Sequence, residues 1–363
     1  MNKLAVRPGI LDIQPYKGGE SAVAGNLRAI KLSSNEGALG PSPAAAEAYR
    51  KAAAELHRYP DGGCTALRTA LAARYGLTMD RIVCGAGSDE IISLLCRAYA
   101  GPGDEVLYSQ HGFLMYPISA RTVGATPVWA PETNLTADVD ALLAKVTART
   151  RILFIANPNN PTGTYLSADA LRRLRAGLRA DILLVIDAAY AEYIGRNDYT
   201  AGEDLVEAHD NVVMSRTFSK IFGLGSIRLG WAYCPAAVAD VLNRVRGPFN
   251  VAGPTQAAGV AALEDFAFVE KVRANNDRWL PWTTEKLRAI GIDVPDSVCN
   301  FALLRFPQAA GRDAAAADTF LKSRGIILRA MGGYGLADSL RLTIGTGEEM
   351  QIVVDALGEF MRR

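Results

Sequence analysis

The chain has 363 residues, a formal net charge of +1, 49% hydrophobic residues and 21% charged residues. This length exceeds one ordinary domain and predicts two lobes with a large core, as in a soluble globular enzyme. The near-neutral charge balance gives no reason to expect a nucleic acid or an anionic membrane surface as a partner.

The N-terminal stretch MNKLAVRPGILDIQPYKGG lacks the continuous apolar core of a signal peptide, and no segment approaches a membrane-spanning length. The five cysteines are scattered without a C-x-x-C pair, and there are only three histidines. We therefore expect no structural metal site and a reducing, cytoplasmic location.

The N-terminal part of the chain contains an irregular arm followed by two helices. Residues 1–30 are rich in glycine and proline and look like an arm that packs on another element or on a partner subunit. The ordered body begins near 31–34, and an alanine-rich helix is expected over 44–56. The turn residues of 58–63 (RYPDGG) then precede an amphipathic helix over 65–75.

From Arg81 onward, short apolar strands alternate with helices. The strands are expected at 82–84, 105–108, 126–129, 151–156, 182–187 and 212–215. Nearly continuous apolar strands separated by helices predict a mostly parallel sheet covered on both faces. Ligands of such sheets bind outside the carboxyl ends of the strands.

Beyond about Asp265 the pattern predicts a smaller α+β lobe. A long helix to Ala289 is followed by two strands and two helices, expected at 301–306, 339–344, 314–324 and 348–362.

Lys220 is the first candidate for chemistry, because it lies just past the apolar strand 212–215. A partly desolvated amine near other cations loses its proton readily and can form a Schiff base with a carbonyl. Arg228, with the hydroxyls of Thr217 and Ser219, could hold a phosphate nearby, so the segment has the parts needed to bind pyridoxal phosphate. The alternatives are an ordinary loop lysine with a surface arginine, or a Ser-Lys hydrolase dyad that uses Ser219 or Thr217.

Polar residues also follow other strands of the predicted sheet. Asp187 ends an apolar strand, where it is either the partner of a pyridine nitrogen, a helix cap or half of a buried ion pair. Asn160 and Tyr190 can both hydrogen-bond the phenolic oxygen of the cofactor ring, although Asn160 is also compatible with a plain Asn-Pro turn.

A further group of residues has weaker signals. Ser88 and Asp89 open a helix whose N-terminus favours an anion, or they simply cap it; the segment 85–90 (GAGSDE) lacks the third glycine of a nicotinamide-binding motif. We expect Phe113 either to stack on the cofactor ring or to pack in the hydrophobic core. Arg341 lies in an apolar strand and needs a carboxylate, either from a substrate or from an internal salt bridge.

Several motifs together resemble fold-type I pyridoxal-phosphate-dependent aminotransferases, and more closely the histidinol-phosphate aminotransferase family. They cover nearly the whole chain and are KLSSNEG (31–37), RYPDG (58–62), GAGSDE (85–90), NPNNPTG (157–163), RTFSKIFGLGSIRLGW (216–231) and LRLTIGT (340–346). The resemblance implies an α/β fold: a large domain with a mostly parallel seven-stranded sheet between helices, plus a smaller α+β domain. It divides the chain into an N-terminal arm (1–30), a large cofactor-binding domain (31–265) and a small C-terminal domain (266–363).

The same resemblance implies a role for each candidate residue. Three residues would be catalytic: Lys220 as Schiff-base lysine and proton shuttle, Asp187 at the pyridine nitrogen, and Tyr190, which would share the phenolic oxygen with Asn160. The phosphate would be held by Ser88, Asp89, Thr217, Ser219 and Arg228, with Phe113 stacked on the ring. Tyr59 would reach the cofactor phosphate of the neighbouring subunit, Arg341 would bind the α-carboxylate, and Tyr16 and Asn35 would lie near the substrate.

The implied activity is amino transfer in two half-reactions within a homodimer whose sites lie at the interface. The implied substrate pairs are glutamate with 2-oxoglutarate and histidinol phosphate with imidazole-acetol phosphate. The chain departs from the family pattern at Ala188, at Gly37-Ala38 and at His111-Gly112, and the last two lie on the substrate side. An aromatic amino-acid aminotransferase and a threonine-phosphate decarboxylase therefore stay open, as does a non-catalytic regulator, which would need a DNA-binding module.

Overall fold

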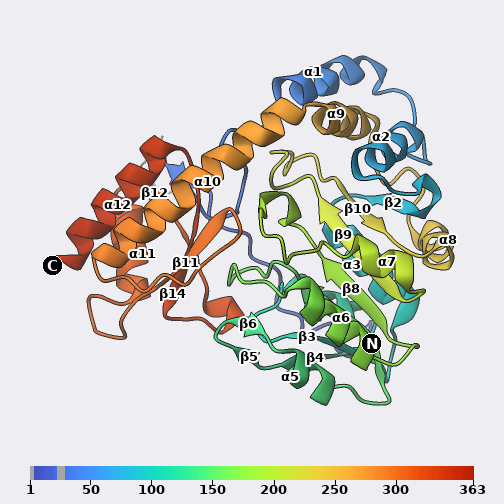
Figure 1. The fold of residues 1–363 in the computed structure, drawn as a ribbon, viewed down its shortest axis with the longest axis horizontal. Helices are drawn as coiled ribbons and strands as arrows, with labels where there is room; N and C mark the ends of the chain where they lie inside the picture. Colours follow the sequence, from blue (N-terminus) through green and yellow to red (C-terminus); the bar gives the residue numbers. More distant parts are fainter. Residues whose placement is uncertain (1–3, 23–28) are drawn as a thin grey trace.

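The computed structural model describes residues 4–22 and 29–363, and its centre is a seven-stranded sheet (Figure 1). Neighbouring strands follow the order β2-β10-β9-β8-β7-β3-β4, and every neighbouring pair is parallel except the two that include β10. The bounds in this order are Ile82–Gly85, Gly230–Tyr233, Val212–Thr217, Leu183–Asp187, Thr150–Ala156, Glu105–Ser109 and Thr126–Ala130. The mostly parallel seven-stranded sheet is confirmed.

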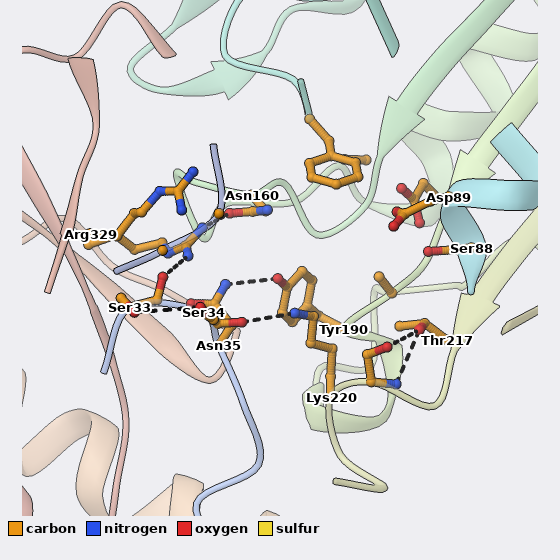
Figure 2. Close-up of a pocket in the computed structure, with 18 of the residues that line it drawn as sticks. Ser33, Ser34, Asn35, Ser88, Asp89, Asn160, Tyr190, Thr217, Lys220 and Arg329 are labelled. Atoms are coloured by element: carbon orange, nitrogen blue, oxygen red, sulfur yellow. Dashed lines mark hydrogen bonds between the residues drawn. The ribbon is translucent and has the colours of Figure 1, made fainter. Parts of the chain in front are cut away.

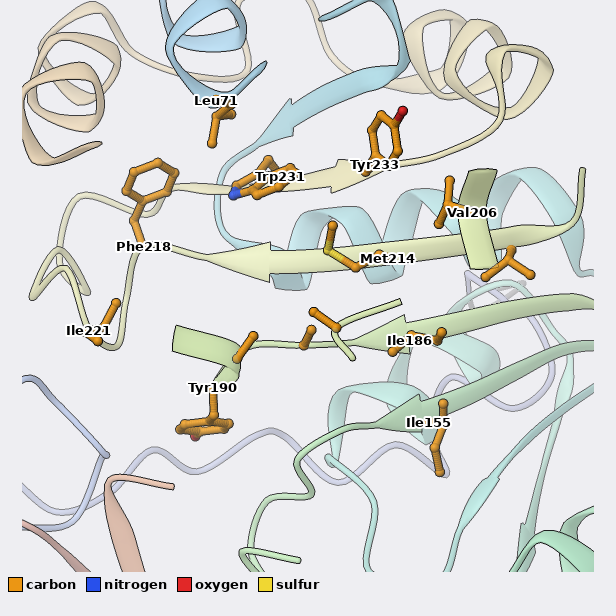
Figure 3. Close-up of a cluster of buried hydrophobic side chains, with 14 of the residues drawn as sticks. Leu71, Ile155, Ile186, Tyr190, Val206, Met214, Phe218, Ile221, Trp231 and Tyr233 are labelled. Carbon is orange, nitrogen blue, oxygen red and sulfur yellow. The ribbon is translucent and has the colours of Figure 1, made fainter. Parts of the chain in front are cut away.

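Helices cover both faces of this sheet, because successive residues of its strands point to opposite sides. Met214 of β9 belongs to one buried cluster, with α2, α6 and α9, whereas Val213 belongs to another, with α3, α4 and α8. Figure 3 shows Met214, Trp231 and Leu71 packed together on the first face. These helices are α2 (Thr65–Tyr75), α6 (Ala168–Gly177), α9 (Gly253–Glu264), α3 (Ser88–Tyr99), α4 (Met115–Thr122) and α8 (Ala236–Val245).

Local capping chemistry sets several helix boundaries. The Ser42 hydroxyl accepts a hydrogen bond from Ala45 N and begins α1 (Pro43–Ala52), which ends in a 3₁₀ turn (Ala53–Glu55), earlier than expected. Helix α3 begins at Ser88, directly after Gly87 with its φ of 88°. Shorter elements complete this region: β5 (Glu132–Thr133), β6 (Thr136–Ala137), α5 (Val139–Ala144), η3 (Ala191–Tyr193) and α7 (Glu203–Ala208).

A second, smaller sheet lies beside the first and has its own buried core. It has the order β11-β14-β13 (Phe301–Arg305, Ser339–Thr343, Arg329–Ala330). Helices α10 (Phe266–Ala289), α11 (Ala314–Ser323) and α12 (Gly347–Met361) accompany it, and the long α10 runs from the neighbourhood of α1 and α9 to this region (Figure 1). A Thr346–Glu349 capping box begins α12.

The chain just after the arm joins this smaller region. Strand β1 (Ile30–Lys31) pairs in parallel with β12 (Ile326–Ile327). Among the described residues no helix is both long and apolar enough to cross a membrane. Nor does any cluster of three histidine, cysteine, aspartate or glutamate side chains suited to a metal ion occur within residues 4–22 and 29–363.

Candidate functional site

A cavity of about 260 Å³ opens where β7, β8 and β9 end, between the large sheet, the arm and the second sheet. Every candidate residue from the sequence lines it except Tyr59, and seven of these candidates are labelled in Figure 2. The candidates in the lining are Tyr16, Asn35, Ser88, Asp89, Phe113, Asn160, Asp187, Tyr190, Thr217, Ser219, Lys220, Arg228 and Arg341. The carboxyl-end rule for parallel sheets therefore located the cavity correctly.

Lys220 reaches the cavity from the loop after β9. Phe218 and Ile221 on either side are fully buried (Figure 3), which anchors the backbone while the lysine points away from that core. Its Nζ donates to the carbonyl oxygen of Ser34 at 3.2 Å and lies 5.7 Å from the centre of the Tyr190 ring. Desolvation, reinforced by the nearby positive charge of Arg341, lowers the pKa of Lys220 to about 8. The amine therefore becomes neutral at a much lower pH than an ordinary lysine does.

Asp187 ends β8 and is 5% exposed. Its Oδ2 accepts a hydrogen bond from the Tyr116 hydroxyl at 2.8 Å, and its Oδ1 accepts one from the Ser215 hydroxyl at 3.3 Å. Burial nevertheless raises the pKa of Asp187 to about 6, and the Asp89 carboxylate adds to the rise. No cation among the described residues forms a salt bridge with Asp187, and no α-helix begins there, so neither an ion pair nor a helix cap explains it. A positively charged ligand group in the cavity would explain why a carboxylate is buried at this position.

One end of the cavity is built to receive an anion. The first turn of α3 contributes Ser88, whose backbone lies at the positive end of the helix dipole. Arg228 Nη1 donates to the Ser219 hydroxyl at 3.3 Å, and Thr217 donates to the same hydroxyl at 3.0 Å. Arg228 Nη2 donates to Asp89 Oδ2 at 2.9 Å, so Asp89 orients the arginine and can offer an anion only its backbone N–H.

The positive φ of Gly87 and the close approach of the Arg228 side chain both favour glycine at this position. A Cβ at this position would lie 2.3 Å from Arg228 Nη2, and the positive φ of Gly87 is itself unfavourable for other residues.

The opposite end of the cavity holds a second arginine. Arg341 is 5% exposed, donates through Nη1 to Asn160 Oδ1 and through Nη2 to the carbonyl oxygen of Ser33 at 2.9 Å, and has no partner for Nε. No carboxylate within the described part of the chain forms a salt bridge with it, which excludes the internal-salt-bridge alternative. A buried guanidinium with a free N–H donor fits an anionic ligand.

Aromatic groups and one polar pair complete the lining. Asn35 Nδ2 donates to the Tyr190 hydroxyl oxygen at 2.8 Å. Phe113 lies edge-on to Tyr16, with ring centres 6.4 Å apart, and at 90° to Tyr116. Tyr59 lies outside the cavity, is 84% exposed, and stacks on Phe249 with ring centres 4.8 Å apart.

Sequence reasoning missed several residues of the site. Ser33, Ser34 and Arg329 line the cavity, while Tyr116 and Ser215 hold Asp187. Arg329 had a usable signal, because it follows the apolar residues 326–328 as Arg341 follows Leu340. The register between the strands, which pairs Arg329 with Arg341, could not be read from the sequence.

These groups fit pyridoxal phosphate. The anion site at α3 and Arg228 suits the phosphate, the uncompensated Asp187 suits a protonated ring nitrogen, and the Lys220 amine in the same cavity suits the aldehyde.

Comparisons with known proteins show which family the chain resembles along nearly its whole length. The family model for aminotransferase class I and II matches residues 28–357. The chain is 67% identical to the histidinol-phosphate aminotransferase of Paramagnetospirillum magneticum, with 99% of each chain covered, and 62% identical to that of Rhodospirillum centenum, with 98% of each covered. A crystal structure of histidinol-phosphate aminotransferase from Sinorhizobium meliloti in complex with pyridoxal-5'-phosphate superposes with a TM-score of 0.88 at 26% identity, covering 98% of this chain and 97% of that one.

Proposed function

The chain belongs to the aminotransferase class I and II family, among its histidinol-phosphate aminotransferases, and we propose that it transfers the amino group between histidinol phosphate and 2-oxoglutarate. It is a pyridoxal-phosphate-dependent transaminase. Beyond this class of enzyme, we propose its substrates, the roles of its residues and its dimeric state.

Pyridoxal phosphate, when bound, supplies an aldehyde for the substrate amine and a ring that accepts the electrons released at the substrate Cα. Lys220, neutral above about pH 8, would take the proton from the substrate Cα and pass it to C4′ of the cofactor, the carbon that carried the aldehyde. Asp187 keeps the proton on the ring nitrogen, and its own burial makes that pairing favourable. Asn160 and Tyr190 would hydrogen-bond the phenolic oxygen of the cofactor. Its phosphate would be held by Ser88, Thr217, Ser219 and Arg228, and Asp89 orients Arg228.

The observation that carries the substrate proposal is the pair of arginines at the far end of the cavity. Arg329 and Arg341 are direct neighbours across β13 and β14, both line the cavity, and neither forms a salt bridge within the described residues. Two adjacent cations suit a phosphate dianion, and they equally suit the carboxylates of glutamate. An aromatic amino acid would use one arginine for its α-carboxylate and leave the other uncompensated.

We also propose that the enzyme acts as a homodimer. Tyr59 does not line the cavity of its own chain, is 84% exposed, and is held in place by its stacking on Phe249. A second copy packed on this face would bury both rings and bring Tyr59 to the partner's cofactor phosphate.

The experiment is a substrate panel with the purified, cofactor-loaded protein. The value of kcat/KM for histidinol phosphate should be more than about 100-fold higher than that for phenylalanine. This ratio corresponds to about 3 kcal/mol of additional transition-state binding. A higher value for phenylalanine would favour the aromatic aminotransferase, and carbon dioxide released from threonine phosphate would favour the decarboxylase. No turnover with any amino donor would favour the non-catalytic regulator.

A further inference from the structure

Arg216 is a fully buried arginine that does not line the cavity, although it directly precedes Thr217, which does. The flanking residues Ser215 and Thr217 point to the cavity side of β9, where Ser215 contacts Asp187. Because side chains alternate along a strand, Arg216 points to the opposite face, toward Met214 and Trp231. It therefore lies behind the reaction site.

The guanidinium of Arg216 connects three segments of chain. Its Nη2 lies 3.1 Å from Glu192 Oε1, in a pair whose side chains are 6% and 8% exposed. Its Nη1 lies 3.5 Å from Glu203 Oε1, at the first residue of α7. Glu192 belongs to η3, the short helix that follows Tyr190. The arginine thus ties the end of β9 to the segment that carries Tyr190.

Two aromatic rings, those of Tyr75 and Trp231, contact the Arg216 guanidinium and restrict its orientation. Its central carbon lies 4.4 Å from the Tyr75 ring centre and 5.7 Å from that of Trp231. The Tyr75 hydroxyl also donates to Glu192 Oε1, at 3.2 Å. A stacked, planar fork with two carboxylate partners is a geometry that lysine cannot reproduce.

We propose that Arg216 and Glu192 are positioning residues that set the distance between Tyr190 and Lys220 from the back of the sheet. Arg216 precedes Lys220 by four residues and Glu192 follows Tyr190 by two, so their ion pair joins the two backbone segments that present the reacting side chains. The spacing of these two segments matters because a misplacement of a reacting side chain by about 1 Å can reduce the catalytic rate by about 100-fold. This inference rests on the proposed function.

The test is the variant Glu192→Asp, which keeps the charge and shortens the side chain by one methylene. We expect kcat to fall by about 10-fold, while KM for histidinol phosphate stays within about twofold. The absorbance maximum of the bound cofactor should shift, and the apoprotein should bind pyridoxal phosphate more weakly in a fluorescence titration. Glu207→Asp is a control with the same substitution: Glu207 pairs with Arg81 at 2.6 Å, in α7 and away from the cavity, so shortening it should leave kcat and absorbance unchanged.

A double variant separates positioning from stability. In Arg216→Met with Glu192→Gln, the buried charge of Glu192 is removed together with its partner, and only Glu203, whose side chain is 32% exposed, loses a partner. Tm should therefore recover in part relative to Arg216→Met alone, while kcat stays low. Normal kcat and absorbance in both Glu192→Asp and the double variant would overturn the inference and leave the pair a purely structural one. A wild-type protein that lacks cofactor absorbance and turnover would instead refute the proposed function.

Discussion

The hydroxyl of Tyr116 donates a hydrogen bond to Asp187 Oδ2 at 2.8 Å, and both groups are buried below the cavity. The hydroxyl comes from α4 on the cavity side of the sheet, and it lowers the pKa of Asp187 against the larger opposing effect of burial. Tyr116 stacks in turn on Phe154, with ring centres 4.7 Å apart, so its position is held by the core. The carboxylate that we assign to the ring nitrogen is therefore fixed in place before any ligand arrives.

Asp187→Asn should stabilise the apoprotein at pH 8. The pKa of Asp187 is about 6 in the folded chain and about 3.9 in the unfolded chain, so its favourable contribution is complete below pH 4 and is lost as the pH rises through about 6. The asparagine variant does not ionise, so its apoprotein should gain up to about 3 kcal/mol at pH 8 and less at pH 5. Thermal unfolding of both apoproteins at the two pH values measures this gain.

With cofactor bound, the wild-type protein should be more stable than Asp187→Asn, because only aspartate compensates a protonated ring nitrogen. Asp187→Asn should lower kcat by at least about 100-fold. An apoprotein stability difference that does not change with pH would contradict the assigned pKa.

The lowered pKa of Lys220 predicts that cofactor uptake depends on pH. Only the neutral amine attacks an aldehyde, and desolvation lowers the pKa of Lys220 to about 8. The rate at which apoprotein combines with pyridoxal phosphate should therefore rise with pH around a midpoint near 8, not near the ordinary lysine value of about 10.4. Stopped-flow absorbance follows this reaction directly.

The matched variant Lys220→Ala should bind the cofactor without the absorbance change and lose nearly all turnover. Wild-type turnover in this variant would exclude Lys220 as the proton carrier.

Arg329→Met should reduce activity toward the phosphorylated substrate selectively. A hydrogen-bonded charge contributes about 1.5–3 kcal/mol, so kcat/KM for histidinol phosphate should fall by about 10- to 100-fold. Turnover of phenylalanine, which lacks the second anionic group, should change by less than about threefold. Arg305→Met is a suitable control, because Arg305 lies in the same sheet but pairs with Asp293 outside the cavity.

Tyr59 offers a test of the shared site. If Tyr59 serves the partner's cofactor, mixing Lys220→Ala with Tyr59→Ala chains produces heterodimers in which one site has both native residues. After subunit exchange at limiting cofactor, about a quarter of all sites should be intact, and activity should rise above that of either variant. Activity that stays at the average of the two parent proteins would show that Tyr59 acts within its own chain or not at all.

Much of the large sheet could be predicted because its strands are apolar throughout. The runs at 151–156, 182–187 and 212–215 match β7, β8 and β9 to within two residues at either end. Strand β10 was missed: its residues follow a glycine-rich turn, and its antiparallel pairing depends on contacts with β2 and β9 that are distant in sequence. The division into an arm, a large domain and a small domain stays a prediction, and β1 pairs with β12 of the smaller region.

The residue roles stay predictions as well, although the structure brings their side chains together. Lys220, Asp187 and Arg228 were identifiable because each is a polar residue in a position where the local pattern calls for burial or a turn. Tyr116, Ser215 and Glu192 gave no such signal, since each becomes informative only through the partner it contacts.

The linear chain by itself determined β7, β8 and β9, the loops after them and the reactive groups that those loops carry, because hydrophobic periodicity and turn chemistry are local properties. Only the tertiary structure decided which groups face one another: Arg329 beside Arg341, Tyr116 on Asp187 and Arg216 behind Lys220. Strand register and helix placement set those contacts, and both depend on burying side chains from segments far apart in the sequence.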